Sequence, residues 1–168
     1  MRRFQWWGWL GAIGGYMAGN GYVWPFAGET WRAHLDTPGS RDLSHLNTFI
    51  TGLDWHTLVP SGLDGMRELI TRAGSCVRAP DYIAAAAARD GSLLVAYVPP
   101  EGAGSFDVDL RAMRGLARAR WFDPTDGSWR AIADALPNAA PHTFRLPGRN
   151  AAKERDWVLV LDAPPAAR

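Results

Sequence analysis

The residues best suited to binding a small polar ligand are concentrated in one segment of this chain, residues 19–36. The aromatic rings of this segment could stack on the flat C–H faces of a sugar, and its asparagine could bond hydroxyls from both ends of the amide. The candidate ligand-binding residues are Asn20, Tyr22, Trp24, Glu29 and Trp31. A sugar pocket is one interpretation. The alternative is that these aromatic side chains pack the segment onto the rest of the fold.

The sequence contains no pattern that indicates a metal or cofactor site. The four histidines are scattered, and no spacing gives a metal triad or a helical pair. They are His34, His45, His56 and His142. The single cysteine, Cys76, excludes an internal disulfide and a cysteine-based zinc site. Residues 123–127 predict a hairpin turn and not a calcium loop. We therefore expect no metal and no cofactor.

The first 55 residues predict a helix, a strand, a long loop and a second helix. Apolar residues fall on one helical face over residues 2–13, and Gly14-Gly15 would end that helix. Residues 16–18 could form a short buried strand. Thr37 followed by Pro38 has the form of an N-cap and first helical position, so a second helix should run from there to Gly52. This order is typical of α/β proteins.

The pattern changes after a predicted connector at residues 56–74. Short apolar or alternating runs, separated by turn signals, indicate an antiparallel sandwich of seven or eight strands. The expected strands are 82–88, 93–98, 106–110, 117–122, 129–132, 142–146 and 157–161. Core packing is the default role for Trp121, Trp129 and Trp157, and a ligand-binding face is the alternative.

Length and composition limit the classes of protein that the chain can represent. A complete eightfold β/α barrel takes about 250 residues, and this chain has 168. Its net charge of +1 gives no support to binding nucleic acid or an anionic membrane. We expect no signal peptide and no transmembrane helix. Six of its nine tryptophans lie in the first 55 residues, which suggests two regions of different kinds.

Several stretches, in this order and spacing, give the chain a resemblance to a known family. In the first third they are Arg3–Ala12, Gly15–Asn20 with Trp24, and Trp31–Ser40. In the remainder they are Asp81–Ala86, Trp121–Gly127 and Asp156–Leu159. The chain resembles the C-terminal part of apiosidase-like glycoside hydrolases, which carry a small β domain described as a putative collagen-binding domain of a collagenase.

The resemblance implies an α+β chain of two parts. Residues 1–60 would be the C-terminal remnant of a β/α (TIM-like) barrel, with its helix–strand–loop–helix order, and residues 65–163 would be an antiparallel all-β sandwich. The resemblance also implies that the two catalytic carboxylates lie on earlier barrel strands, upstream of this chain. It would then be a truncated bacterial protein, with secreted or periplasmic relatives.

Three functions are compatible with these expectations. The chain could be the C-terminal portion of a glycoside hydrolase-like protein, supplying part of a sugar pocket and inactive alone. It could be a β-sandwich module that binds polysaccharide or a collagen-like protein. It could also be a purely structural accessory domain. The expected partner is a carbohydrate, with a collagen-like protein as the alternative and with no nucleic acid or membrane. No catalytic residue is assigned. Glycoside cleavage needs two carboxylates, and in residues 19–36 Asp36 lies beside the cap of the second helix, which leaves Glu29 alone.

Overall fold

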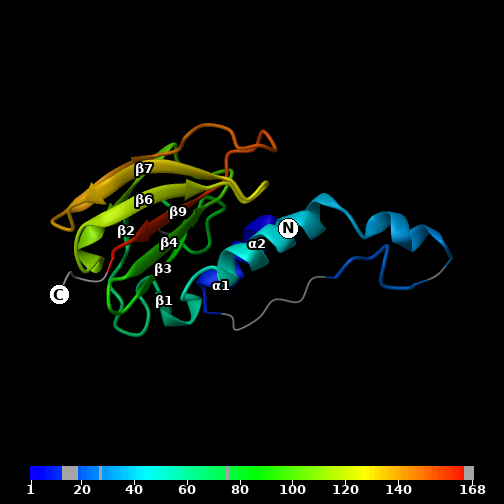
Figure 1. Ribbon diagram of the computed structural model, residues 1–168, viewed down its shortest axis with the longest axis horizontal. Helices are drawn as coiled ribbons and strands as arrows, with labels where there is room; N and C mark the ends of the chain where they lie inside the picture. The colour runs from blue at the N-terminus through cyan, green and yellow to red at the C-terminus, as the bar shows by residue number, and fades with distance from the viewer. Residues whose placement is uncertain (13–18, 27, 75, 165–168) are drawn as a thin grey trace.

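The computed structural model describes residues 1–12, 19–26, 28–74 and 76–164, which form helices packed on a β sandwich (Figure 1). The two α-helices of the described residues are α1 (Arg2–Leu10) and α2 (Pro38–Thr51). The strands are β1 (Leu58–Pro60), β2 (Ile70–Arg72), β3 (Ala84–Ala88), β4 (Leu93–Val98), β5 (Ser105–Asp109), β6 (Ala117–Phe122), β7 (Trp129–Leu136), β8 (Pro141–Arg145) and β9 (Trp157–Asp162).

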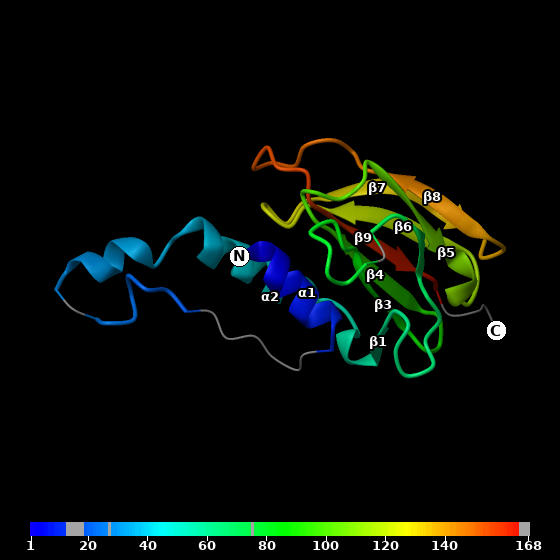
Figure 2. The ribbon, with the colours of Figure 1, turned by 180° about the vertical axis from the view of Figure 1, so that it is seen from behind.

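The strands form two antiparallel sheets. The larger sheet has six strands in the order β1-β3-β4-β9-β6-β7, and the smaller has three in the order β2-β5-β8. The smaller sheet covers one face of the larger sheet, and α1 and α2 lie against the other face (Figure 2). The prediction of an antiparallel sandwich is confirmed, with helices as a third layer.

The central strands are buried along their whole length because both faces of the larger sheet are covered. Side chains of β4 alternate between the two cores. Leu94 and Val98 pack toward the smaller sheet, whereas Val95 and Tyr97 pack in the cluster that contains the helices. This explains why residues 93–98 read as a continuous apolar run, with no polar residue on either face.

The helical core is built on aromatic side chains from α1 and α2. Trp6 is fully buried and stacks on Tyr97, with ring centroids 5.7 Å apart and planes 4° from parallel. Phe49 meets Trp6 edge-on at 5.0 Å. Of the five consecutive alanines of β3, Ala84, Ala86 and Ala88 lie beneath this cluster, and their small side chains leave room for the helices to approach the sheet.

The predicted second helix is confirmed at both ends. The Thr37 hydroxyl accepts a hydrogen bond from the backbone N–H of Ser40 at 3.2 Å, and Pro38 occupies the first turn. Gly52 follows the last helical residue. The first helix is also confirmed but is shorter than expected, since it ends at Leu10. The expected end at Gly14-Gly15 and the strand at 16–18 lie outside the described residues.

The expectation of a plain connector over residues 56–74 was wrong. This segment contains β1 and β2, which bring the described strands to nine. Each is only three residues long, too short to show an alternating pattern. β1 lies at the sheet edge, where Pro60 is tolerated because its missing N–H faces no further strand.

Within residues 1–60, where a barrel fragment was expected, the one strand of the described part is β1, which belongs to the larger sheet of the sandwich. Before β1, the described residues form α1, α2, turns and two short 3₁₀ helices, Thr30–His34 and Trp55–Thr57. None of the helices in the described ranges combines the length and the apolar character needed to span a bilayer. The fold shown is therefore a mostly antiparallel β domain with two packed helices.

Candidate functional site

The segment that we call the aromatic loop, residues 19–36 with residue 27 outside the description, extends away from the sandwich beyond the start of α2 (Figure 1). The Asn20 side chain links the start of this loop to its end. The Nδ2 of Asn20 donates to the backbone carbonyl of His34 at 3.0 Å, and its Oδ1 accepts from the backbone N–H of Tyr22 at 3.0 Å. The Tyr22 ring stacks on His34 at 4.5 Å and remains 72% exposed. The loop thus presents an open tyrosine face.

The other predicted residues of the loop lie farther from the sandwich. Trp24 is 78% exposed. Trp31 is half-buried by Phe26, which meets it edge-on at 5.3 Å, and by the Arg32 guanidinium, 4.6 Å from its ring centroid. Glu29 is exposed and forms an ion pair with Arg32 at 2.6 Å. The predicted residues are therefore a spread-out surface, not one closed pocket.

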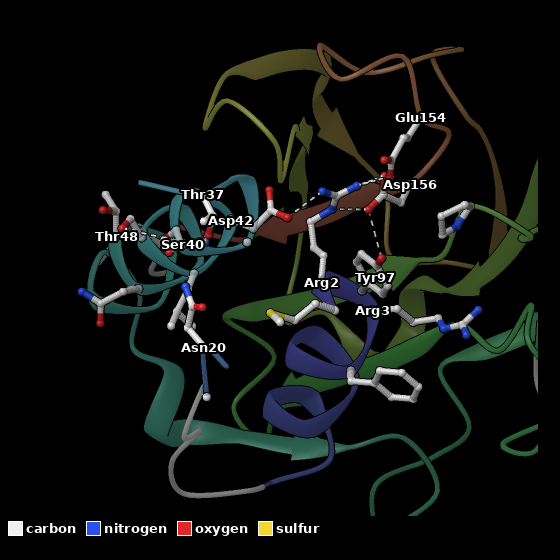
Figure 3. Close-up of a pocket in the computed structure, with 18 of the residues that line it drawn as sticks. Arg2, Arg3, Asn20, Thr37, Ser40, Asp42, Thr48, Tyr97, Glu154 and Asp156 are labelled. Carbon is white, nitrogen blue, oxygen red and sulfur yellow. Dashed lines mark hydrogen bonds and ion pairs between the residues drawn. The ribbon is translucent and has the colours of Figure 1, made fainter. Parts of the chain in front are cut away.

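A hollow of about 990 Å³ separates the base of the aromatic loop from the sandwich, and we call it the interface hollow (Figure 3). Of the five predicted ligand-binding residues, only Asn20 and Tyr22 line it. Its remaining walls come from the start of α1, the first turns of α2, Tyr97 and the turns around residues 100 and 155. It is large enough for a small ligand or a loop of another chain segment.

Arg2 crosses the interface hollow and joins the two helices to the sandwich (Figure 3). Its guanidinium forms a two-point contact with Asp156, Nε to Oδ2 at 2.6 Å and Nη2 to Oδ1 at 3.0 Å. It also donates to Asp42 on α2 at 2.9 Å and to Glu154. The Arg2 side chain is only 10% exposed. The Asp42 side chain is only 13% exposed in this network.

Asp156 is fully buried and has further partners. Its carboxylate accepts from the Tyr97 hydroxyl at 3.0 Å and from Asn150 Nδ2 at 2.7 Å. Burial, and then the negative charge of Asp156, raise the pKa of Tyr97 well above its usual range. Burial disfavours the charged form of Arg2 and acts to lower its pKa. The hydrogen bond to Asp156 and the nearby negative charges outweigh burial, so the pKa of Arg2 is raised. The network joins three carboxylates to one guanidinium and so connects α1 and α2 to the sandwich at the hollow.

Sequence reasoning missed this cluster. The sequence patterns assign Arg2 and Asp42 no role beyond their places in the two predicted helices. The signal that could have found it is Asp156, a charged residue directly before the apolar run of β9. A carboxylate next to a buried strand requires a partner. That partner lies 154 positions away, beyond the reach of a local pattern.

The other residues that the sequence singles out lie outside the aromatic loop. The predicted turn at 123–127 is confirmed, and Asp123 clips it by accepting from the backbone N–H groups of Thr125 and Ala151, both at 2.8 Å. Trp121 and Trp157 are core residues, whereas Trp129 is partly exposed. Within the described ranges, no cluster of three or more histidine, cysteine, aspartate or glutamate side chains could hold a metal ion.

The two packed sheets define an antiparallel β-sandwich domain. The chain belongs to the family described as "Putative collagen-binding domain of a collagenase", whose model matches residues 68–162. A search of curated proteins finds no match.

Two solved structures share the fold. One is titled "Glycoside hydrolase", with a TM-score of 0.63 at 20% identity, and the match covers 84% of this chain and 29% of that one. The other is a glycoside hydrolase family 5 protein from Bacteroides vulgatus ATCC 8482, with a TM-score of 0.64 at 18% identity, covering 83% of this chain and 28% of that one. This chain spans less than a third of the length of either.

Proposed function

We propose that this chain is the accessory β module of a glycoside hydrolase-like protein, together with the helical segment that joins it to the rest of that protein. The likeness to the two glycoside hydrolase structures covers more of this chain than the sandwich alone occupies, which supports including the helices. In this proposal residues 1–60 correspond to the end of a β/α barrel and residues 65–163 to the β module. The closer assignment to apiosidase-like enzymes stays a prediction.

The observation that carries the proposal is the hydrophobic core between the larger sheet and the two helices. The face that carries Val95, Tyr97 and Val158 is apolar and lies beneath Trp6 and Phe49. A freestanding antiparallel sandwich exposes polar side chains on its outer faces. This sheet is instead built to be covered by helices, as expected for a module fixed rigidly to a neighbouring domain.

We further propose that the aromatic loop contributes to binding carbohydrate. Its candidate residues remain Asn20, Tyr22, Trp24, Glu29 and Trp31. The exposure of the Tyr22 and Trp24 rings supports this role, because an accessible aromatic face is what a sugar ring stacks on. Asn20 and Tyr22 also line the interface hollow, so a chain of sugars could run from the loop into it.

We propose that the chain does not cleave glycosides alone. Hydrolysis needs two carboxylates about 5–9.5 Å apart, one of them acting as an acid. The two carboxylates of the aromatic loop are both paired at the surface, Glu29 with Arg32 and Asp36 with Arg41. The carboxylates of Asp42 and Asp156 are both occupied by Arg2. Because these carboxylates are engaged in ion pairs, they support a binding role for the chain and not a catalytic one.

Retention on insoluble polysaccharides tests the proposal. The chain is expected to bind at least one member of a panel, and Trp24→Ala is expected to reduce retention. Trp55→Ala is the matched control, since Trp55 is exposed outside the aromatic loop and the interface hollow. Retention on collagen alone would favour the activity that the family description names, and failure to bind any member of the panel would overturn the carbohydrate role.

A structural role for the sandwich is the second candidate function. The Arg2 network favours it, because three carboxylates from α2 and the sandwich converge on one guanidinium. In this case the module would stabilise the neighbouring domain without binding any ligand. No retention on polysaccharide or collagen, combined with a large loss of stability on removing Arg2, would be its signature.

A further inference from the structure

A second hollow, of about 290 Å³, lies between α2 and the hairpin of β6 and β7, and we call it the hairpin pocket. Its side-chain walls include His45, Thr48, Phe49, Arg120, Phe122 and Trp129. Ligand pockets begin at about 300 Å³, so this volume suits one sugar ring. Only Thr48 is shared with the interface hollow.

The hairpin pocket has a fixed aromatic wall. Trp129 is 42% exposed, and its ring is held by two aromatic rings and by the Arg120 guanidinium, whose carbon lies 4.3 Å from the ring centroid. Phe49 lies nearly parallel to it at 5.8 Å, and Phe122 lies 5.0 Å away. Because α2 and β6 supply these supports, the exposed part of the indole is presented without the entropy cost of ordering a free side chain.

The lining of the hairpin pocket is positively charged. Arg120 is its only formally charged residue, and no carboxylate lines it. The Asp162 carboxylate that pairs with Arg120 at 2.9 Å also accepts from Arg118 at 2.8 Å, so one negative charge serves two guanidinium groups. The Nε of Arg120 is buried and has no hydrogen-bond partner within the described residues. Because that atom is buried, a ligand can meet only the exposed part of the guanidinium, and the Arg120 side chain is 26% exposed.

The turn between β6 and β7 leaves space for His45. Gly127 has φ +77°, and a Cβ there would lie 3.1 Å from His45 Nδ1. Glycine therefore permits both the turn conformation and the close approach of the imidazole. His45 and Thr48 lie one turn apart on α2 and add hydrogen-bonding groups to the wall opposite the hairpin.

We propose that the hairpin pocket binds a uronic acid residue of a polysaccharide. The sugar ring would lie against the exposed part of Trp129, its carboxylate would be bound by the exposed part of the Arg120 guanidinium and by His45, and Thr48 would bond a hydroxyl. A planar guanidinium matches a carboxylate better than it matches a neutral hydroxyl. This inference rests on the proposed carbohydrate role, but it assigns a site separate from the aromatic loop and a charged class of sugar.

Calorimetric titration of the full chain tests the inference, with a galacturonic acid trimer as the probe and a galactose trimer as its neutral match. The acidic trimer is expected to bind at least about tenfold more tightly, as a charge-assisted hydrogen bond implies. Arg120→Gln and His45→Gln should each weaken its binding, while Trp55→Ala, at an exposed position outside the hairpin pocket and the aromatic loop, should leave it unchanged. Using two variants guards against one that fails to fold, and circular dichroism checks each.

Equal binding of the two trimers, no binding of the acidic trimer, or binding unaffected by both substitutions would overturn the inference. So would full displacement by acetate at matched concentration, since the pocket would then bind any small carboxylate. If the chain is still retained on polysaccharide through Trp24 in these cases, the proposed function stands and only the hairpin pocket assignment fails.

Discussion

Arg2 and Asp156 form a buried two-point ion pair between the first turn of α1 and the residue before β9. Tyr97 donates to the same carboxylate from β4, and Asp42 ties α2 to the same guanidinium. One side chain therefore connects both helices to the sandwich. This relationship makes the helices part of the domain's own structure, and not an appended segment.

Substituting Arg2 should destabilise the whole chain. Arg2→Met leaves the Asp156 carboxylate buried without its cation, which costs about 3 kcal/mol in the free energy of unfolding. Urea denaturation measures this loss. The matched control is Arg41→Met, because Arg41 pairs with Asp36 at the surface and such pairs contribute less than about 1 kcal/mol. Equal losses in the two variants would contradict the role given to Arg2.

Trp6 should be the tryptophan of the first third that matters most for stability. Trp6→Ala removes a fully buried ring stacked on Tyr97 and should cost about 3–5 kcal/mol. Trp24→Ala, at an exposed position, should change the free energy of unfolding by less than about 0.5 kcal/mol. Thermal denaturation compares the two variants. A comparable drop in Tm for both would mean that the aromatic loop packs on the fold.

Acid should weaken the smaller sheet. Hydrogen bonds from Arg72 and Thr143 lower the pKa of Asp107 to about 2, and those from Arg111 have the same effect on the pKa of Asp109. An unfolded aspartate has a pKa of about 3.9. Because the folded values are lower, their contribution to stability is full above pH of about 4 and is lost as the pH falls toward about 2.

Asp107→Asn tests this pH dependence. The variant should lose less stability than the wild-type chain between pH 6 and pH 2.5, because it has one fewer carboxylate to protonate. Denaturant unfolding at the two pH values provides the measurement. The control is Asp134→Asn on β7, whose carboxylate makes no hydrogen bond within the described residues. An unchanged pH dependence in Asp107→Asn would contradict the assignment.

Local patterns predicted the elements well and the long-range pairs poorly. Thr37 and Gly52 marked both ends of α2, because capping depends only on adjacent residues. The run at 93–98 predicted a strand but could not show that its two faces belong to different cores, since that depends on helices outside the strand. β1 and β2 were missed for lack of length.

The same distinction between local patterns and long-range contacts applies to the candidate site. Residue type singled out the aromatic loop, but it could not separate Trp6, which is core, from Trp24, which is exposed. Both are tryptophans in the same third of the chain. The hairpin pocket brings His45 and Arg120 together from elements 75 positions apart, and no spacing rule connects them. Tertiary packing alone creates these sites.

The claim that the helices and the sandwich are one unit is tested most directly by producing residues 58–164 alone and comparing their unfolding with that of the full chain. Without α1 and α2, the face that carries Val95, Tyr97 and Phe122 is exposed to water. The account predicts that this fragment self-associates, binds a hydrophobic dye and lacks a cooperative transition. A monomeric fragment that unfolds cooperatively with the stability of the full chain would contradict it.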